Sequence, residues 1–453
     1  MATTYLTQTI SSGNQRTFTI SVWVKRSALD AGAGLGSEII TYAETPGSAD
    51  ARGEFFMRSD DTLGLGFNPT SSSWSSFYTT SLYRDVSGWY HLVAKVDTTQ
   101  SVDTDRLKLY VNGVAQSFTG TLPILNFDTG FNVDGYTYQI GRNAQGESDY
   151  WNGLMSHFYF IDGTAYDAST FGETDSDTGE WKIITSPSVT MGTNGFTILK
   201  DGNTITDQST NSNNFTLGAG TLTNTEDCPS DVYATQNPLQ SASAGGITYT
   251  FANGNTTVEC DGSVGNNSTL GASKGKFYCE GKLISFTNSG AGPNVYQIGI
   301  RSLNPSTNLG ISSSGGEGWV YQGTGEKDSN NSSSSFGDTY TTDDIIGVAM
   351  DLDNNKLYFA KNGTWQNSGD PTSGATGTGA AYTITAPAST TDGYYFFACG
   401  HQDNKAKWSL NYGNGYFGTT IISSAGTNAS NIGIFEYDVP TGYTALSTKG
   451  LQE

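Results

Sequence analysis

No stretch of ten or more residues in this chain repeats apolar side chains at the 3.6-residue spacing of an α-helix. Short runs rich in aromatic and β-branched residues occur instead, and Gly, Asn, Asp or Ser closes each run. This pattern is typical of all-β sandwiches. We therefore expect an all-β fold with helix below about 10% of the residues, far under the usual one third or so.

The chain has 453 residues, which is too many for one ordinary domain. Strand-like runs gather in two regions, so we predict two β-sandwich domains in tandem. The expected divisions are a first sandwich over 1–165, an ordered connecting segment with one or two strands over 166–244, a second sandwich over 245–422 and a short C-terminal tail over 423–453.

The stretch GVAMDLDNNKLYFAKNGTW allows two interpretations, a calcium loop or a β-hairpin. Asp351, Asp353 and Asn355 fit the first three ligand positions of an EF-hand loop. However, Lys356 stands where that loop needs Gly, and Asn362 stands where it needs a bidentate Glu. Asp and Asn also suit turns, and the runs on both sides read as strands. We therefore predict a hairpin.

Two Asn-Gly pairs, Asn112-Gly113 and Asn362-Gly363, follow strand-like runs. Asn-Gly is the strongest short signal for a two-residue hairpin turn, in which both central residues have positive φ. A Val at Gly363 should therefore cost more stability than a Val at a loop glycine such as Gly377.

The formal net charge is −21, from 43 acidic and 22 basic residues. Such a field repels phosphate backbones and anionic membranes, so we expect no nucleic-acid partner and no membrane insertion. No run of about 18 apolar residues is present, and the stretch MATTYLTQTISSGNQ does not read as a signal peptide. Only 14% of the residues are charged, so the surface should consist of hydroxyls and amides that suit carbohydrate or sibling proteins.

The four cysteines, Cys228, Cys260, Cys279 and Cys399, show no C-x-x-C spacing and therefore no zinc signature. A Cys260–Cys279 disulfide stays open as an alternative, although synthesis in a reducing cytosol argues against it.

Catalytic motifs are not evident. A β-sandwich glycosidase would place two carboxylates across the scissile bond, and the best candidate stretch is ETDSDTGE. On a strand the two carboxylates would follow the pattern E-x-D-x-x-E, or a form one residue longer with a bulge. Glu173 and Asp175 fit the first two acids, but Glu180 comes one place too late even for the longer form. A solvated acidic turn is therefore the favoured interpretation. His91 and His157 lie in strand-like runs and read as sheet residues. We therefore expect no enzyme.

Carbohydrate binding would use aromatic faces near amides on exposed loops. The candidates are Trp74, Trp151 and Trp365. The alternative is that each ring covers a sheet end as part of the core. That alternative is favoured for Trp151 and Trp365, which fall inside strand-forming motifs, whereas the two interpretations of Trp74 are nearly balanced.

Several motifs in the first region, SVWVK, GWYHLVAKVD, LKLYVNGV and QIGR…WNGLMSHFYFIDGTAYDASTF, follow one another in an order that resembles the laminin G-like, concanavalin A-like family. In the second region GKFYCEGKLISF, DLDNNKLYFAKNGTW and WSLNYGNGYF together resemble a SPRY domain, with Cys279 where a Trp is common. The first resemblance implies a jelly-roll-like sandwich and, in most members, a binding module.

Some laminin G-like modules bind calcium at the sandwich rim, and the loop NAQGESDYWNG offers Asn143, Glu147 and Asp149. Calcium needs about six to eight oxygen ligands, so a second loop would have to contribute Asp128 or Asp134. The plain loop is the favoured interpretation, and no other cofactor is expected.

The order of modules, with NGFTILKDG, DQSTNSNNFTLG and DCPSDVYATQNPL between the sandwiches and VPTGYTALST after them, resembles structural proteins of marine tailed bacteriophages. The resemblance implies a non-enzymatic virion protein, made in the host cytoplasm, that forms a tail fibre, spike or head-associated appendage and contacts a host surface glycan or receptor. Two alternatives stay open: a decoration or adaptor protein that binds only other virion proteins, and a glycan-degrading enzyme.

A single copy would bind a glycan weakly, whereas several linked copies gain roughly 10²–10⁴ in avidity over one site. The chain shows no heptad repeat that would gather copies into a coiled coil. We therefore expect a compact homo-oligomer, with a trimer favoured, held by the sandwiches or by other virion proteins.

Overall fold

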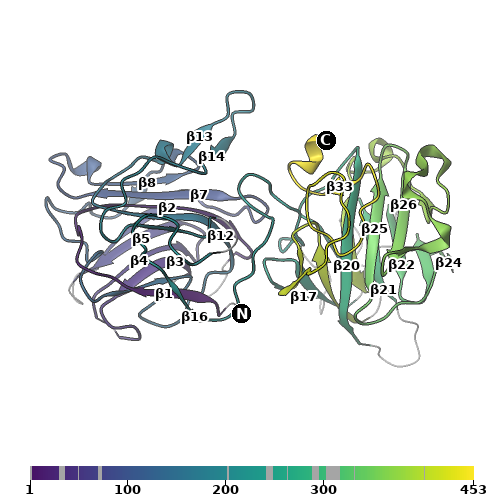
Figure 1. Ribbon diagram of the computed structural model, residues 1–453, viewed down its shortest axis with the longest axis horizontal. Coiled ribbons are helices and arrows are strands. Elements are labelled where there is room, and N and C mark those ends of the chain that lie inside the picture. Colours follow the sequence, from purple (N-terminus) through teal and green to yellow (C-terminus); the bar gives the residue numbers. More distant parts are fainter. Residues whose placement is uncertain are drawn as a thin grey trace. The chain divides into compact units, whose positions relative to one another are not determined.

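The computed structural model describes residues 3–29, 36–48, 50–69, 74–200, 204–240, 248–262, 264–287, 295–302, 317–330, 332–401 and 404–453. The chain divides into two compact units, Met1–Asn224 and Thr225–Glu453. Strands account for 44% of the residues and helices for 5%, which confirms the all-β prediction (Figure 1). Every helix in these ranges is a short 3-10 turn, and none could cross a membrane.

The first unit is a sandwich of two antiparallel sheets. One sheet has eight strands in the order β10 (Phe118–Thr119), β6 (Ser75–Thr79), β5 (Leu63–Asn68), β4 (Arg52–Arg58), β3 (Gly36–Ala43), β11 (Thr137–Ile140), β1 (Tyr5–Thr9) and β16 (Thr216–Ala219). The other has six, in the order β15 (Phe196–Ile198), β12 (Gly153–Asp162), β2 (Thr17–Arg26), β7 (Tyr90–Asp97), β8 (Leu107–Val111) and β9 (Val114–Ala115).

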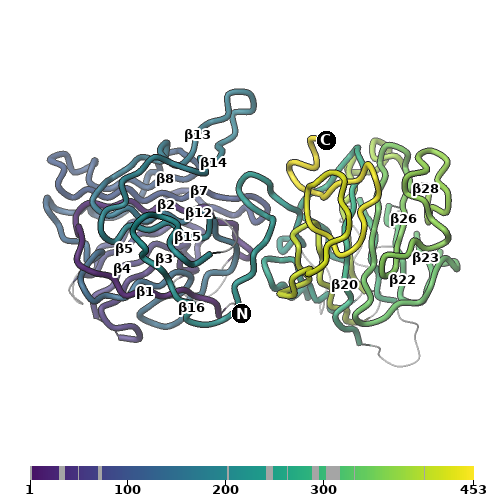
Figure 2. The backbone as a smooth tube through the Cα atoms, in the orientation of Figure 1, coloured from purple at the N-terminus to yellow at the C-terminus, as the bar shows by residue number. Residues whose placement is uncertain are grey.

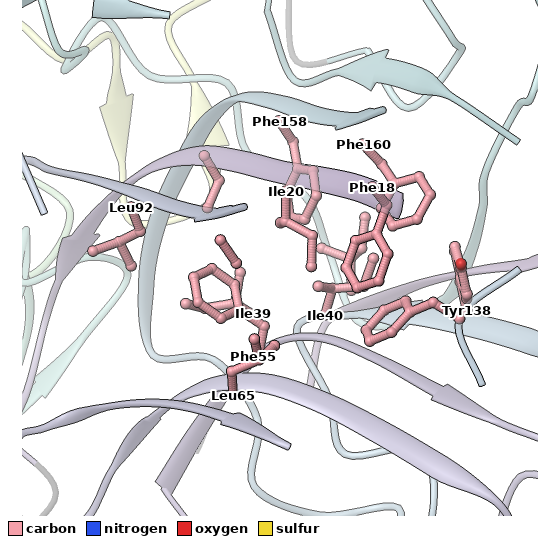
Figure 3. Close-up of a cluster of buried hydrophobic side chains, with 14 of the residues drawn as sticks. Phe18, Ile20, Ile39, Ile40, Phe55, Leu65, Leu92, Tyr138, Phe158 and Phe160 are labelled. Atoms are coloured by element: carbon pink, nitrogen blue, oxygen red, sulfur yellow. The ribbon is translucent and has the colours of Figure 1, made fainter. Parts of the chain in front are cut away.

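Apolar side chains fill the space between these two sheets (Figure 3). Phe18 and Ile20 of β2 and Phe160 of β12 meet Phe55 of β4 and Leu65 of β5, and all five are fully buried. Burial of each such side chain stabilises the fold by about 1.5–3 kcal/mol.

The expected connecting segment, 166–244, divides between the two units. β15 extends the six-stranded sheet by pairing with β12, and β16 extends the eight-stranded sheet by pairing with β1. A hairpin of β13 (Gly172–Thr174) and β14 (Trp181–Ile183) also belongs to the first unit (Figure 1). The first unit therefore continues well beyond the predicted end at residue 165.

The second unit is also a two-sheet sandwich. The larger sheet runs β17 (Thr248–Ala252), β18 (Thr257–Asp261), β30 (Lys405–Asn411), β20 (Lys276–Phe286), β25 (Ile345–Asp351), β26 (Lys356–Lys361) and β27 (Thr364–Trp365), with β28 (Tyr382–Thr383) on β26 and β33 (Thr444–Ala445) on β20. The smaller runs β19 (Val264–Asn267), β29 (Phe396–His401), β21 (Tyr296–Arg301), β22 (Gly318–Gln322), β23 (Glu326–Ser329) and β24 (Ser332–Ser335). β31 (Tyr416–Phe417) pairs with β32 (Thr420–Ile421).

The hairpin interpretation of the DLDNN stretch is confirmed, because β25 pairs with β26 and β26 with β27. The buried Asp351 accepts hydrogen bonds from the backbone and side-chain amides of Asn354 and pairs with Lys276 at 3.0 Å. Asp353 accepts a hydrogen bond from the backbone of Gly275. Both carboxylates therefore serve the turn and its neighbours.

The C-terminal segment, expected as a short tail, packs on the larger sheet of the second unit. Phe435, Val439 and Tyr443 are buried in a cluster with Tyr278 of β20. β33 pairs in parallel with β20, and the segment runs beside that strand (Figure 2). These residues are therefore part of the second unit.

All four cysteines are free thiols, so the Cys260–Cys279 disulfide is not formed. Cys260, Cys279 and Cys399 are buried in the core of the second unit. Burial raises the pKa of the Cys279 and Cys399 thiols well above the ordinary value. These two cysteines act as small core residues.

Candidate functional site

Strand β4 gives the eight-stranded sheet a mixed aromatic and charged outer face. Phe55 and Met57 point into the core. Side chains on a strand alternate between its two faces, so the other positions of β4 share the outer face. These positions are Arg52, Glu54, Phe56 and Arg58.

Two glycines of β5 let aromatic rings rest on this outer face. A Cβ at Gly66 would lie 2.4 Å from the Trp74 ring, and a Cβ at Gly64 would lie 2.8 Å from the Phe56 ring. Only a residue without a side chain leaves room for these rings. Tyr78 of β6, opposite Gly64, packs edge-on against Phe56 at 6.4 Å between ring centroids.

Trp74 is the accessible aromatic of this group. It immediately precedes β6 and keeps 38% of its surface exposed. The Arg52 guanidinium carbon lies 4.8 Å from the centre of its ring, a cation–π contact. A similar contact joins Arg58 to Tyr78 at 4.1 Å. The outer face therefore presents an exposed indole with a cation beside it.

Beneath Arg52 lies a pair of buried carboxyl groups. The side-chain amide of Asn143 donates to Oε1 of Glu38 at 3.1 Å and to Oε1 of Glu54 at 3.3 Å. Arg52 Nε lies 3.2 Å from the same Glu54 oxygen. Burial raises the pKa of Glu38 well above its ordinary value, and the neighbouring Glu54 adds to the rise; burial also raises the pKa of Glu54.

This acid pair does not have the access that a glycosidase dyad needs. Glu38 is 0% exposed and Glu54 is 1% exposed. Catalytic carboxylates must touch the glycosidic oxygen and the sugar carbon. The pair instead anchors the loop that begins at Asn143.

The loop considered for calcium uses its side chains internally. Asn143 Oδ1 accepts hydrogen bonds from the backbone of Gln145 and Gly146. Glu147 accepts one from Arg142 at 3.1 Å, and Asp149 accepts one from a serine hydroxyl at 2.8 Å. Within the described ranges, no group of three or more His, Cys, Asp or Glu side chains could hold a metal ion. All three side chains are therefore engaged in contacts within the loop and its neighbours.

The other two candidate tryptophans are less accessible than Trp74. Trp151 is 7% exposed and belongs to the core of the first sandwich. Trp365 is half-buried and packs edge-on against Tyr278 in the second unit. The structure thus leaves Trp74 as the exposed member of the three.

His91 and the acidic residues of the β13–β14 hairpin are engaged in contacts within the first unit. His91 is fully buried, contacts Ser21 at 2.9 Å and accepts a hydrogen bond from the Trp181 indole, and burial lowers its pKa to about 3. Asp175 accepts hydrogen bonds from the backbone of its own turn and pairs with Lys182. Glu173, which was expected in the same acidic turn, lies in strand β13.

Sequence reasoning found Trp74 but missed Arg52, Glu38 and Glu54. The stretch RGEFFMR places a charged residue at both ends of the strand and an acid between them, and the following LGLGF places glycines at alternate positions. Together these patterns could have indicated two paired strands, with aromatic rings packed on the face of the second strand that carries its glycines.

Comparison with known families fits this architecture. Residues 2–168 match the concanavalin A-like lectin/glucanases superfamily, and residues 290–398 match the SPRY domain. The chain therefore carries a concanavalin A-like domain followed by a SPRY domain, as the sequence resemblances implied. Folds of these two kinds are consistent with the binding of a glycan or a protein.

One curated relative is the ATP-dependent RNA helicase DDX1 of Xenopus laevis, which is 34% identical over 99 residues. That match spans 22% of this chain and only 12% of the helicase. Among solved structures, the SPRY domain of human HERC1 is 14% identical, with 39% of this chain and 96% of that chain covered and a TM-score of 0.28. A heptameric SAP-like pentraxin from Limulus polyphemus is 20% identical, with 36% and 71% covered and a TM-score of 0.26.

Proposed function

We propose that this chain is a non-enzymatic carbohydrate-binding protein and that the outer face around Trp74 is its binding site. The observation that carries the proposal is the exposed indole that rests on Gly66 beside Arg52. An aromatic ring packs against the apolar face of a sugar, while nearby polar groups fix its orientation.

The finer proposal is that the protein is a virion protein of a tailed bacteriophage. The order of modules and the motifs between them, which resemble marine phage structural proteins, support it. In this role the protein would be made in the host cytoplasm, assemble with other virion proteins and contact a host surface glycan. A surface with few charged residues fits such a contact, since only 14% of the chain is charged.

A glycan array tests the binding proposal. Wild-type protein should bind a subset of the array, and Trp74→Ala should lower the affinity about tenfold or more, because it removes the apolar stacking surface. Tyr394→Ala is the matched control, since Tyr394 is an exposed aromatic of the second unit. Unchanged binding by Trp74→Ala, or equal losses in both variants, would reject this site.

A separate experiment tests the virion proposal. An antibody against the purified chain should label particles of a phage that encodes it, as seen by electron microscopy. Purified particles that carry no copy of the chain would overturn the virion role and leave the carbohydrate proposal standing.

A further inference from the structure

We infer that Arg52 recognises an anionic group, a carboxylate or a sulfate, on the sugar that stacks against Trp74. The inference rests on the proposed carbohydrate function and narrows its ligand class.

The chain contains eight arginines, and seven of them donate side-chain hydrogen bonds to described residues. These seven are Arg16, Arg26, Arg58, Arg84, Arg106, Arg142 and Arg301. Arg52 differs, because no hydrogen bond from its side chain is found in the described part of the chain. Its Nε is buried and faces Glu54, so the donors that a ligand could reach are those of the two terminal nitrogens. Its guanidinium therefore keeps donors to spare.

The position of Arg52 directs these donors to the binding face. Its side chain is 21% exposed, and its guanidinium lies over the Trp74 ring. The ion pair with Glu54, at 3.2 Å, holds the guanidinium from below. A sugar packed against the part of Trp74 that stays exposed would bring its substituents next to a cation that is already held in place.

Guanidinium geometry favours an anionic partner. The group presents its N–H donors in a planar fork that matches carboxylate and similar oxyanions with two parallel hydrogen bonds. Such charge-assisted bonds are about twice as strong as neutral ones. A neutral sugar hydroxyl would use only part of this capacity, so the site should discriminate in favour of acidic sugars.

The surrounding charge makes the site distinct from the rest of the surface. The whole chain carries a net charge of −21 and would repel acidic glycans at long range. On the outer face of β4, however, two arginines flank the aromatic rings, and Arg58 is already paired with Asp60 at 2.6 Å. Arg52 is therefore the cation of this strand that lies against Trp74, and Arg58, which already donates to Asp60, supplies a matched control.

The test uses the full chain and a glycan array whose neutral, carboxylated and sulfated members are scored separately. Wild-type protein should prefer anionic members, and the affinity for the best of them should fall as salt rises. Removal of the negative charge from the best-bound glycan, by methyl esterification of its carboxylate or loss of its sulfate, should weaken binding about ten- to hundredfold.

Variants assign the effect to the residue. Arg52→Gln should lose the preference for anionic members, Arg52→Lys should keep part of it because the charge stays while the fork is lost, and Arg58→Gln should keep it. Thermal melting of each variant checks that the first sandwich is folded. If Arg52→Gln does not fold, the preference of the wild-type protein for anionic over neutral glycans still tests the inference.

The outcomes separate the two proposals. Binding that depends on Trp74 but is equal for neutral and anionic members would overturn the inference and keep the carbohydrate function. A preference for anionic members that survives Arg52→Gln would also overturn it. No binding to any member of the array would contradict both.

Discussion

Two glycines explain how aromatic rings come to lie on the outer face of the first sandwich. Any side chain at Gly64 or Gly66 would occupy the space that Phe56 and Trp74 fill. Trp74 is thereby held on the sheet while part of its surface stays open to solvent. A ring fixed in this way loses little conformational entropy when it binds a ligand.

Glycine also decides the tight turns. The predicted positive φ values are confirmed at both Asn-Gly pairs, with 47° and 78° at Asn112 and Gly113 and 47° and 80° at Asn362 and Gly363. Gly377 does not serve as a loop reference for Gly363, because Gly377 also has a positive φ, of 64°, where it ends a 3-10 turn. An ordinary loop glycine is needed as the reference.

Gly88 provides that reference in the first unit, since it is not among the glycines with positive φ and a Cβ there would meet only the flexible Asp85 side chain. Gly113→Val should lower the free energy of unfolding by about 1–2 kcal/mol or more, because a β-branched residue resists positive φ. Gly88→Val should change it by less than about 0.5 kcal/mol. Chemical denaturation of the two variants measures both values, and equal losses would contradict the turn assignment.

At the scale of elements, one carboxylate ties the C-terminal segment to β20. Glu280 is fully buried and accepts hydrogen bonds from the backbone of Glu436 and Tyr437 and from the side chains of Asn411 and Tyr278. Burial raises its pKa to about 7, while the four donors favour the charged form and limit the rise. The segment that carries Phe435 and Tyr443 is thus docked through a titratable group.

This raised pKa gives a pH dependence with a definite sign. The folded state holds the proton more tightly than the unfolded chain, so the contribution to stability is full below pH 4.5 and is lost as the pH rises through 7. The melting temperature of the second unit should fall between pH 5 and pH 8. In Glu280→Gln, which cannot ionise, the fall should be smaller, and an equal slope in both proteins would show that another group controls it.

The elements also show how far sequence reasoning reached. The hairpins of β8–β9 and β25–β26–β27 were predictable because their turn residues and strands are neighbours in the chain. The docking of residues 423–453 was not, because it depends on Glu280, more than 150 positions earlier. The pairing of Glu38 with Glu54 was missed because the loop residue that joins them, Asn143, is remote in sequence.

At the scale of the whole molecule, the division between the units falls at Asn224, inside the predicted connecting segment of 166–244, so the first unit extends past its predicted end at residue 165. Phe196, Ile198 and Phe215 complete the first core and are almost fully buried. The sequence did not indicate that residues 166–224 belong to the first sandwich, because β15 and β16 are only three and four residues long and lie among loops. Their contribution comes from pairing with distant strands.

A fragment of residues 1–224 should therefore unfold in one cooperative thermal transition, as small domains do. A fragment of residues 1–165 lacks three large core side chains, each worth about 1.5–3 kcal/mol, and should melt far lower or fail to fold. Calorimetry compares the two, and equal melting temperatures would show that the added strands are dispensable.

The proposed role in a virion also predicts an assembly. A single site with one exposed indole would bind one glycan weakly, so several copies are needed for firm attachment. We expect a compact homo-oligomer, most simply a trimer, alone or on other virion proteins. Light scattering measures its mass, and a strict monomer under both conditions that still binds host cells tightly would refute the avidity argument.

The central claim is that a sugar binds on Trp74, and the most direct measurement observes each tryptophan separately. Fluorine-labelled tryptophan gives one NMR signal for each of the eight indoles, and Trp→Phe variants assign those of Trp74, Trp151 and Trp365. Addition of the best glycan from the array should shift or broaden the Trp74 signal in a saturable way and leave those of Trp151 and Trp365 in place. A saturable shift of another tryptophan, with Trp74 unchanged, would contradict the account.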